Sequence, residues 1–258
     1  MGANWLILAT GGLISGILAG LLGIGGGTIL VPLLVAIGYA PVQAVGTSSL
    51  AILVTSMSGS VQNWRMGYFD WKRVIALGLP ALATAQIGVY IASQTLPYIL
   101  LVAFGLLLLT NVYLVELRKR ITTGETPRSP TFNPVLARLF TGGAAGVLAG
   151  LFGVGGGVIM VPLQMLLLTE KIKVAIQTSL GVIIITAISA CIGHTLKGNV
   201  LFIPGVILGI GGLIGAQFST RVLPRLSDKI VSLIFRLFLG ILSIYIFWQA
   251  WNSYLQTK

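Results

Sequence analysis

Two glycine clusters are the residues of this 258-residue chain best placed to bind a ligand. Positions 23–27 read GIGGG and positions 153–157 read GVGGG, each inside a long apolar stretch. Glycine costs about 1 kcal/mol relative to alanine within a helix, so each cluster predicts a helix end followed by a helix start. A restarted helix presents free N–H groups and a positive dipole end, which can bind an anion. The candidate binding residues are Gly25, Gly26, Gly27, Thr28, Gly155, Gly156 and Gly157.

Hydroxyl and amide side chains recur at matching depths further along the two apolar regions. Those near expected helix starts could cap the helix or donate to an oxyanion. Two glutamines within helices are suited to interhelical bonding or to substrate contact. These additional candidates are Thr47, Ser48, Gln177, Thr178, Ser179, Gln86 and Gln217.

His194 is the only histidine, and it is a candidate proton site or a histidine at the membrane interface. A single cysteine excludes an internal disulfide and a multi-cysteine metal site. All five acids lie at expected span ends or in loops, so no buried carboxylate is expected to relay protons. We therefore predict no catalytic residue, cofactor or metal site. Transport would be coupled to the substrate's own proton, to a proton on His194 or to a bound cation, or it would be uncoupled.

The composition predicts an all-α polytopic membrane protein. Only 8% of residues are charged and 56% are hydrophobic, with a mean hydropathy of +1.00. A soluble domain carries about 25% charged residues, whereas a lipid bilayer accepts this much apolar surface. The net charge of +11 fits either membrane orientation or an anionic substrate. No basic run has the interleaved aromatic residues that would predict nucleic-acid binding.

The chain contains one unit written twice. Residues 16–33 and 146–163 are identical at 13 of 18 positions, and the likeness continues at an offset of 131, where Thr47-Ser48 matches Thr178-Ser179. Asn63 likewise matches His194. We predict a first repeat over 1–122, a polar linker over 123–131 and a second repeat over 132–258.

Each repeat predicts a long helix, a short apolar helix after the glycines, and three more long helices. Helices are expected because backbone groups in lipid must be satisfied within their own segment. The expected ranges are 5–22, 28–38, 43–64, 73–93 and 97–117, then 135–152, 157–168, 174–195, 200–219 and 229–251.

Basic residues predict the orientation of the repeats. If each short helix folds back as a hairpin, 13 cations face one side and only Lys197 and Lys258 face the other. If each pair crosses once as a broken helix, the division is 10 to 5. The positive-inside rule favours hairpins and a cytoplasmic linker. Each repeat then makes an odd number of crossings, which predicts two inverted repeats.

The doubled motif G-[IV]-G-G-G-x-[IL]-x-V-P-L, at 23–33 and 153–163, resembles the sulfite exporter TauE/SafE family, also called the toluene-sulfonate uptake permease family. The resemblance covers nearly the whole chain. It implies a multi-pass permease of the cell inner membrane for small sulfur-containing anions such as sulfite, sulfonates, sulfoacetate or thiosulfate. The family includes exporters and importers.

The leading hypothesis is a secondary transporter that exports sulfite or organosulfonates by alternating access. Its partners would be the small anion, the lipid bilayer and a coupling proton or cation. The alternatives are a passive anion channel and an importer of sulfonates or thiosulfate. An enzyme is not expected, because one histidine, one cysteine and no buried acid supply too few groups for acid–base or metal chemistry.

Overall fold

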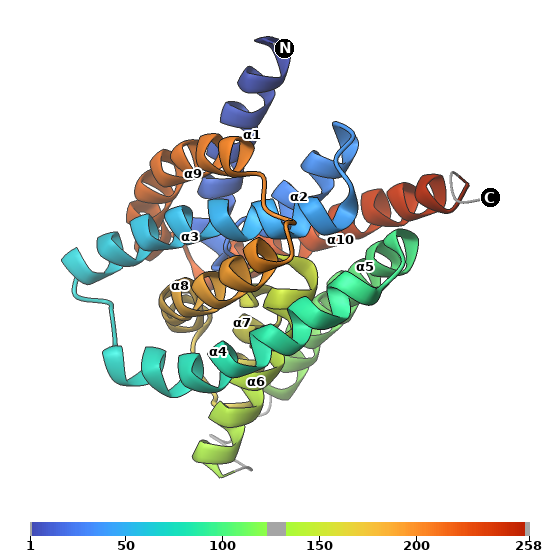
Figure 1. Cartoon of the computed structure of the whole chain (residues 1–258). Coiled ribbons are helices and arrows are strands. Elements are labelled where there is room, and N and C mark those ends of the chain that lie inside the picture. Colours follow the sequence, from blue (N-terminus) through green and yellow to red (C-terminus); the bar gives the residue numbers. More distant parts are fainter. Residues whose placement is uncertain (1, 123–132, 256–258) are drawn as a thin grey trace.

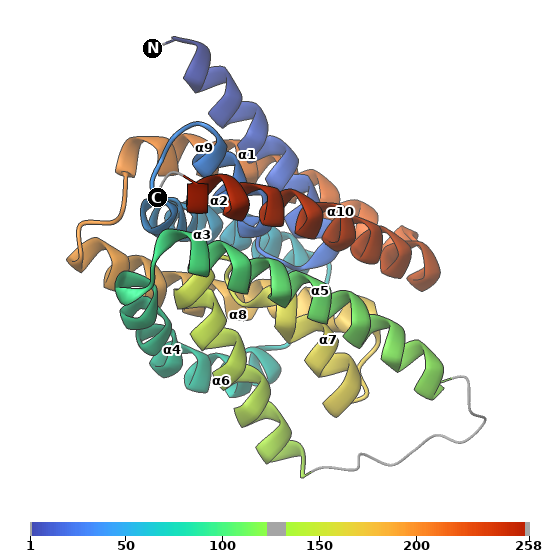
Figure 2. The same ribbon diagram turned by 90° about the vertical axis from the view of Figure 1, so that its right-hand side faces the viewer.

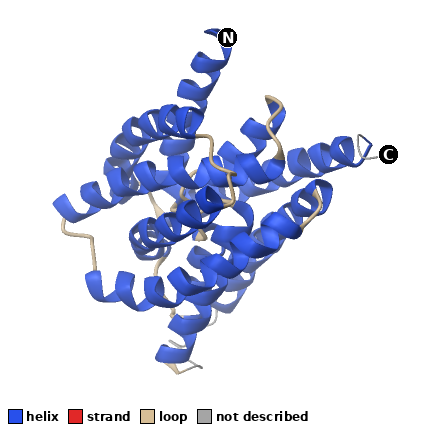
Figure 3. Ribbon diagram, in the orientation of Figure 1, coloured by secondary structure: helices blue, strands red, loops and turns tan. Residues whose placement is uncertain are grey.

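The computed structural model describes residues 2–122 and 133–255, and these are almost entirely helical (Figures 1 and 3). The linker expected at 123–131 lies outside the described residues. The elements are α1 (Gly2–Leu22), α2 (Gly27–Ala36), α3 (Pro41–Arg65), α4 (Trp71–Gln94), α5 (Pro97–Thr122), α6 (Pro134–Phe152), α7 (Gly157–Leu167), α8 (Ile172–Leu196), α9 (Phe202–Val222), the 3₁₀ turn η1 (Leu223–Arg225) and α10 (Asp228–Leu255).

Eight of these helices are long and apolar enough to cross a bilayer, which confirms the prediction of a polytopic membrane protein. The two short apolar helices are α2 and α7. Proline begins α3, α5 and α6, where its fixed φ suits the first helical turn. The helix α5 runs five residues past its expected end at 117, because Leu, Arg and Lys at 117–120 are good helix formers.

Both short helices fold back on the helix before them, as the basic residues predicted. Ser15 of α1 donates a 2.9 Å hydrogen bond to the carbonyl of Gly26, just before α2. A methyl group added to Gly11 of α1 would overlap Leu33 of α2. The turns rely on left-handed backbone, with φ of +83° at Gly26 and +76° at Gly156, which only glycine adopts freely. Each repeat thus begins with a glycine-broken hairpin.

The repeats interlock through their outer helices. A Cβ added to Gly16 of α1 would overlap the backbone of Gly212 in α9, and one added to Gly146 of α6 would overlap Ala81 of α4. These two contacts occupy matching positions in the two repeats. Small residues therefore let each hairpin lie directly against a long helix of the other repeat.

The helices α3 and α8 form the buried centre and run antiparallel. Gly46 near the start of α3 meets His194 near the end of α8, and Gly59 near the end of α3 meets Leu180 near the start of α8. Figure 2 shows both ends of the chain on one side, while α5 ends, and α6 and α10 begin, on the opposite side.

That opposite side carries most of the cations, and we call it the basic face. Ionic contacts tie its connections together: Arg73 at the start of α4 reaches Glu170 before α8 at 3.3 Å, and Lys173 of α8 reaches Asp228 of α10 at 3.7 Å. Its described cations are Arg65, Lys72, Arg73, Arg138, Lys171, Lys173, Arg221, Arg225 and Lys229.

Candidate functional site

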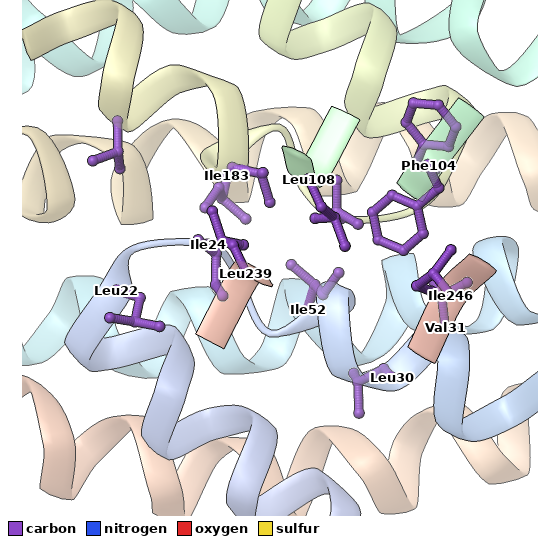
Figure 4. Packing of buried hydrophobic residues seen from close by; sticks show 14 of the residues in the cluster. Leu22, Ile24, Leu30, Val31, Ile52, Phe104, Leu108, Ile183, Leu239 and Ile246 are labelled. Atoms are coloured by element: carbon purple, nitrogen blue, oxygen red, sulfur yellow. The ribbon is translucent and has the colours of Figure 1, made fainter. Parts of the chain in front are cut away.

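The two glycine turns meet at the centre of the molecule. A Cβ added to Gly27 would overlap the carbonyl oxygen of Gly153, and one added to Gly157 would overlap that of Gly23. Both turns are buried. A Cβ added to Gly25 would lie 3.0 Å from Ile52 and 3.2 Å from Ile183, and Figure 4 shows these side chains in the buried apolar core with Ile24, so apolar side chains flank the meeting point.

Each turn is held by a serine of the other repeat. Ser48 of α3 donates a 2.8 Å hydrogen bond to the carbonyl of Gly153, and Ser179 of α8 donates a 2.7 Å bond to the carbonyl of Gly23. All four groups are buried. Neither serine caps its helix, because α3 already begins at Pro41 and α8 at Ile172. The capping interpretation of these hydroxyls is therefore wrong.

Two further hydroxyls fix the peptide groups that precede the short helices. Ser15 donates to the carbonyl of Gly26 and Thr186 to that of Gly155, both at 2.9 Å. In a trans peptide the next N–H points opposite to the bonded carbonyl. Binding these carbonyls therefore directs the N–H groups of Gly27 and Gly156 away from the serine and threonine.

The start of α2 has unmet hydrogen-bonding capacity. Its N-cap Gly26 supplies no side chain, and no hydrogen bond from the N–H of Gly27 or Thr28 reaches an acceptor in the described part of the chain. The Thr28 side chain is 0% exposed, and its hydroxyl has no partner among the described residues. A buried polar group without a partner costs about 1–3 kcal/mol. This threonine is Val158 in the second repeat, so it is not needed to build the turn.

The threonines and glutamine beside the serines make no side-chain hydrogen bond to the glycine turns within the described residues. Thr47 accepts a 3.0 Å hydrogen bond from the N–H of Leu201, which precedes α9. Its counterpart Thr178 makes no side-chain hydrogen bond within the described ranges. Gln177 faces a surface pocket between α4 and α8. The capping interpretation fails for all three, because they lie within their helices.

Gln86 and Gln217 join helices and lie outside the glycine turns. Gln86 of α4 donates to the carbonyl and hydroxyl of Ser189 in α8, at 2.7 and 2.8 Å. Gln217 of α9 donates to Gln62 of α3 at 2.8 Å and accepts from Ser58 at 3.1 Å. Both glutamines therefore link helices of different repeats.

His194 is fully buried between helices, two residues before the end of α8. Its Nε2 lies 2.9 Å from the carbonyl oxygen of Gly150, an atom that can only accept, so Nε2 carries a proton. Its Nδ1 has no partner among the described residues. The side chain reaches this depth because Gly46 of α3 leaves room for it.

Four side chains that shape the turns were not among the sequence candidates. Ser15 and Thr186 hold one turn each; Ser15 has no identical counterpart in the second repeat, whereas Thr186 repeats Thr55 at the offset of 131. Ile52 and Ile183 flank both turns and repeat at the offset of 131. A search for apolar identities between the repeats would have found this pair.

Comparisons with known proteins agree with this architecture. A model of the family described as "Sulfite exporter TauE/SafE" matches residues 8–246. Similar proteins include YunE of Bacillus subtilis, 25% identical over 96% of this chain and 98% of that protein. Another, from Xylella fastidiosa strain Temecula1, is 28% identical over 95% of each chain. Both carry the name "probable membrane transporter protein".

Proposed function

Since the chain belongs to the sulfite exporter TauE/SafE family of membrane transporters, we propose that it exports a small sulfur-containing anion, sulfite or an organosulfonate. Transport is secondary and proceeds by alternating access. The anion binds where the two glycine turns meet, at the starts of α2 and α7.

One observation carries this assignment: the buried hydroxyl of Thr28 has no partner in the described structure, and it stands beside the free amides that begin α2. Hydroxyl and amide donors at the positive end of a helix dipole are the groups that bind an oxyanion. The matching start of α7 has Gly156 as its N-cap and no side-chain cap. The N-terminal ends of α2 and α7 would together bind one anion.

Neutral donors suit a carrier better than buried cations do. A cation in the middle of a membrane is expensive and would hold an anion tightly. Oriented N–H groups compensate the lost hydration while leaving the site uncharged when it is empty. The neutral hydroxyls of Ser15 and Thr186 keep those N–H groups oriented without adding an electric charge to the site.

The arrangement of the repeats supports alternating access. The hairpins reach the centre from opposite ends in Figure 2, and α3 and α8 cross antiparallel between them. These are properties of inverted repeats, in which one repeat rocks against the other around a fixed midplane site. The basic face would then be cytoplasmic by the positive-inside rule.

Flux measurements with purified protein in liposomes test the proposal. We expect saturable sulfite flux that is accelerated by sulfite on the opposite side, which a passive channel would not show. Gly25→Leu and Gly155→Leu should abolish flux, because both positions have positive φ and lie against Ile52 and Ile183. Wild-type flux in both variants would refute the glycine site, and flux without saturation or countertransport would indicate a channel.

A further inference from the structure

A pocket opens on the basic face where α3 turns into α4. Its volume is about 480 Å³, and its lining includes Tyr68, Asp70, Lys72, Arg73 and Gln177. The first four belong to the start of α4 and the connection before it, and the last to α8 of the other repeat. The pocket therefore lies between the repeats.

Gln177 is the feature that points to a ligand. It is 7% exposed, and its side-chain amide makes no hydrogen bond to any residue that the structure describes. It stands two residues before Ser179, whose hydroxyl binds the first glycine turn. Along the axis of α8, at a rise of about 1.5 Å per residue, Gln177 and Ser179 are only about 3 Å apart, although at about 100° per residue their side chains leave nearly opposite faces of the helix.

The matching place in the other repeat is closed. Gly46 is the counterpart of Gln177, and a Cβ there would lie 2.6 Å from the carbonyl oxygen of Asn199. Leu201 N–H also binds the Thr47 hydroxyl at 3.0 Å, so the connection before α9 is fastened onto α3. In the other repeat Asp70 is the counterpart of Leu201, and Thr178 is the counterpart of Thr47. No hydrogen bond joins the N–H of Asp70 to the hydroxyl of Thr178 within the described structure.

From this difference between the repeats we infer that the pocket is the open mouth of the transport path, and that the fastened α8–α9 connection closes the opposite mouth. The inference rests on the proposed function and adds the route to its site. The side-chain amide of Gln177 donates a hydrogen bond to the sulfur anion as the anion loses its hydrating water. The connection between α3 and α4 would close over Gln177 when the other mouth opens.

Charge around the pocket fits capture of an anion. Lys72 is exposed and forms no ion pair with any described residue, whereas Arg73 is shared between Asp70 at 3.1 Å and Glu170 at 3.3 Å. Both cations stand in the first turn of α4, where they oppose the helix dipole. Membrane orientation accounts for basic residues on this face, but it does not account for a glutamine beside them that is only 7% exposed and makes no hydrogen bond to the described residues where it lines the pocket.

Thiol labelling tests the inference without requiring transport. Cys191, the only cysteine, is first replaced by alanine. In that background Gln177→Cys should react with a membrane-impermeant maleimide applied to the basic face, about tenfold faster than Val200→Cys from either side, because only an accessible thiolate reacts. Val200 lies in the fastened connection, is 8% exposed and leaves the bond between Thr47 and Leu201 in place. Equal rates, or faster labelling of Val200→Cys, would overturn the open and closed assignments.

Kinetics test the capture step. Lys72→Gln should raise the KM for sulfite roughly threefold at low ionic strength and less in high salt, with the maximal rate unchanged. Arg138→Gln removes an exposed cation of the same face outside the pocket and should leave the KM unaltered. Equal effects of the two variants would refute capture by the pocket. Absence of flux in wild-type protein would instead refute the proposed function, while the labelling result would still stand.

Discussion

The hydroxyl of Ser48 donates a 2.8 Å hydrogen bond to the carbonyl of Gly153, which lies 105 positions later in the chain. The same bond recurs from Ser179 to Gly23 at 2.7 Å, so each repeat holds the glycine turn of the other. A rearrangement of one hairpin must therefore involve the buried helix of its partner repeat.

Removing one of these hydroxyls should loosen the fold and the site together. We expect Ser48→Ala and Ser179→Ala each to destabilise the protein by about 1–3 kcal/mol, because a buried carbonyl loses its donor. Unfolding in detergent by denaturant, followed by tryptophan fluorescence, would measure the change. The control is Ser56→Ala, whose hydroxyl bonds only carbonyls of its own helix, at 2.7 and 3.1 Å. Equal losses in all three variants would show that the bonds between repeats are unimportant.

The contact between the two turns leaves no room for a methyl group. Gly27→Ala and Gly157→Ala would each place a Cβ on a carbonyl oxygen of the other turn, so we expect poor folding or loss of sulfite flux. Gly240→Ala in α10 meets nothing within 4 Å and should be neutral or slightly stabilising, since alanine favours helix by about 1 kcal/mol. Yield of monodisperse protein and flux in liposomes are the measurements. Full activity of both turn variants would contradict the close contact.

The interhelical glutamines should matter for stability and not for substrate affinity. Gln217→Leu breaks the bond to Gln62, and interhelical hydrogen bonds of this kind are worth about 1 kcal/mol. We expect a lower midpoint of denaturation with an unchanged KM for sulfite. Gln94→Leu, at an exposed end of α4, is the matched control and should change neither. A raised KM for sulfite in Gln217→Leu, but not in Gln94→Leu, would show that Gln217 contributes to substrate binding.

The repeated glycine clusters made the hairpins predictable, because glycine interrupts a helix whatever surrounds it. The basic residues also predicted that the short helices fold back, and the contact between Leu33 and Gly11 shows this for α2. Roles that depend on contacts between distant segments were not predictable. Thr47 was expected either to cap a helix or to donate to the anion, but Pro41 begins that helix earlier and the Thr47 hydroxyl accepts a bond from Leu201. His194 is buried at a place where its neighbour on α3 is a glycine, a contact between distant segments.

Thr28 offers the most direct measurement. Thr28→Val removes only the unpartnered hydroxyl and installs the residue found at the matching position of the second repeat. A hydrogen bond to a charged group is worth about 1.5–3 kcal/mol, so the KM for sulfite in liposomes should rise about tenfold or more. The protein should unfold at an equal or higher denaturant concentration, because an unsatisfied buried group is gone. Thr55→Val, whose hydroxyl bonds its own helix at Ala51, should leave the KM unchanged. A Thr28→Val protein with wild-type KM, or one that is less stable, would contradict a substrate site at the glycine turns.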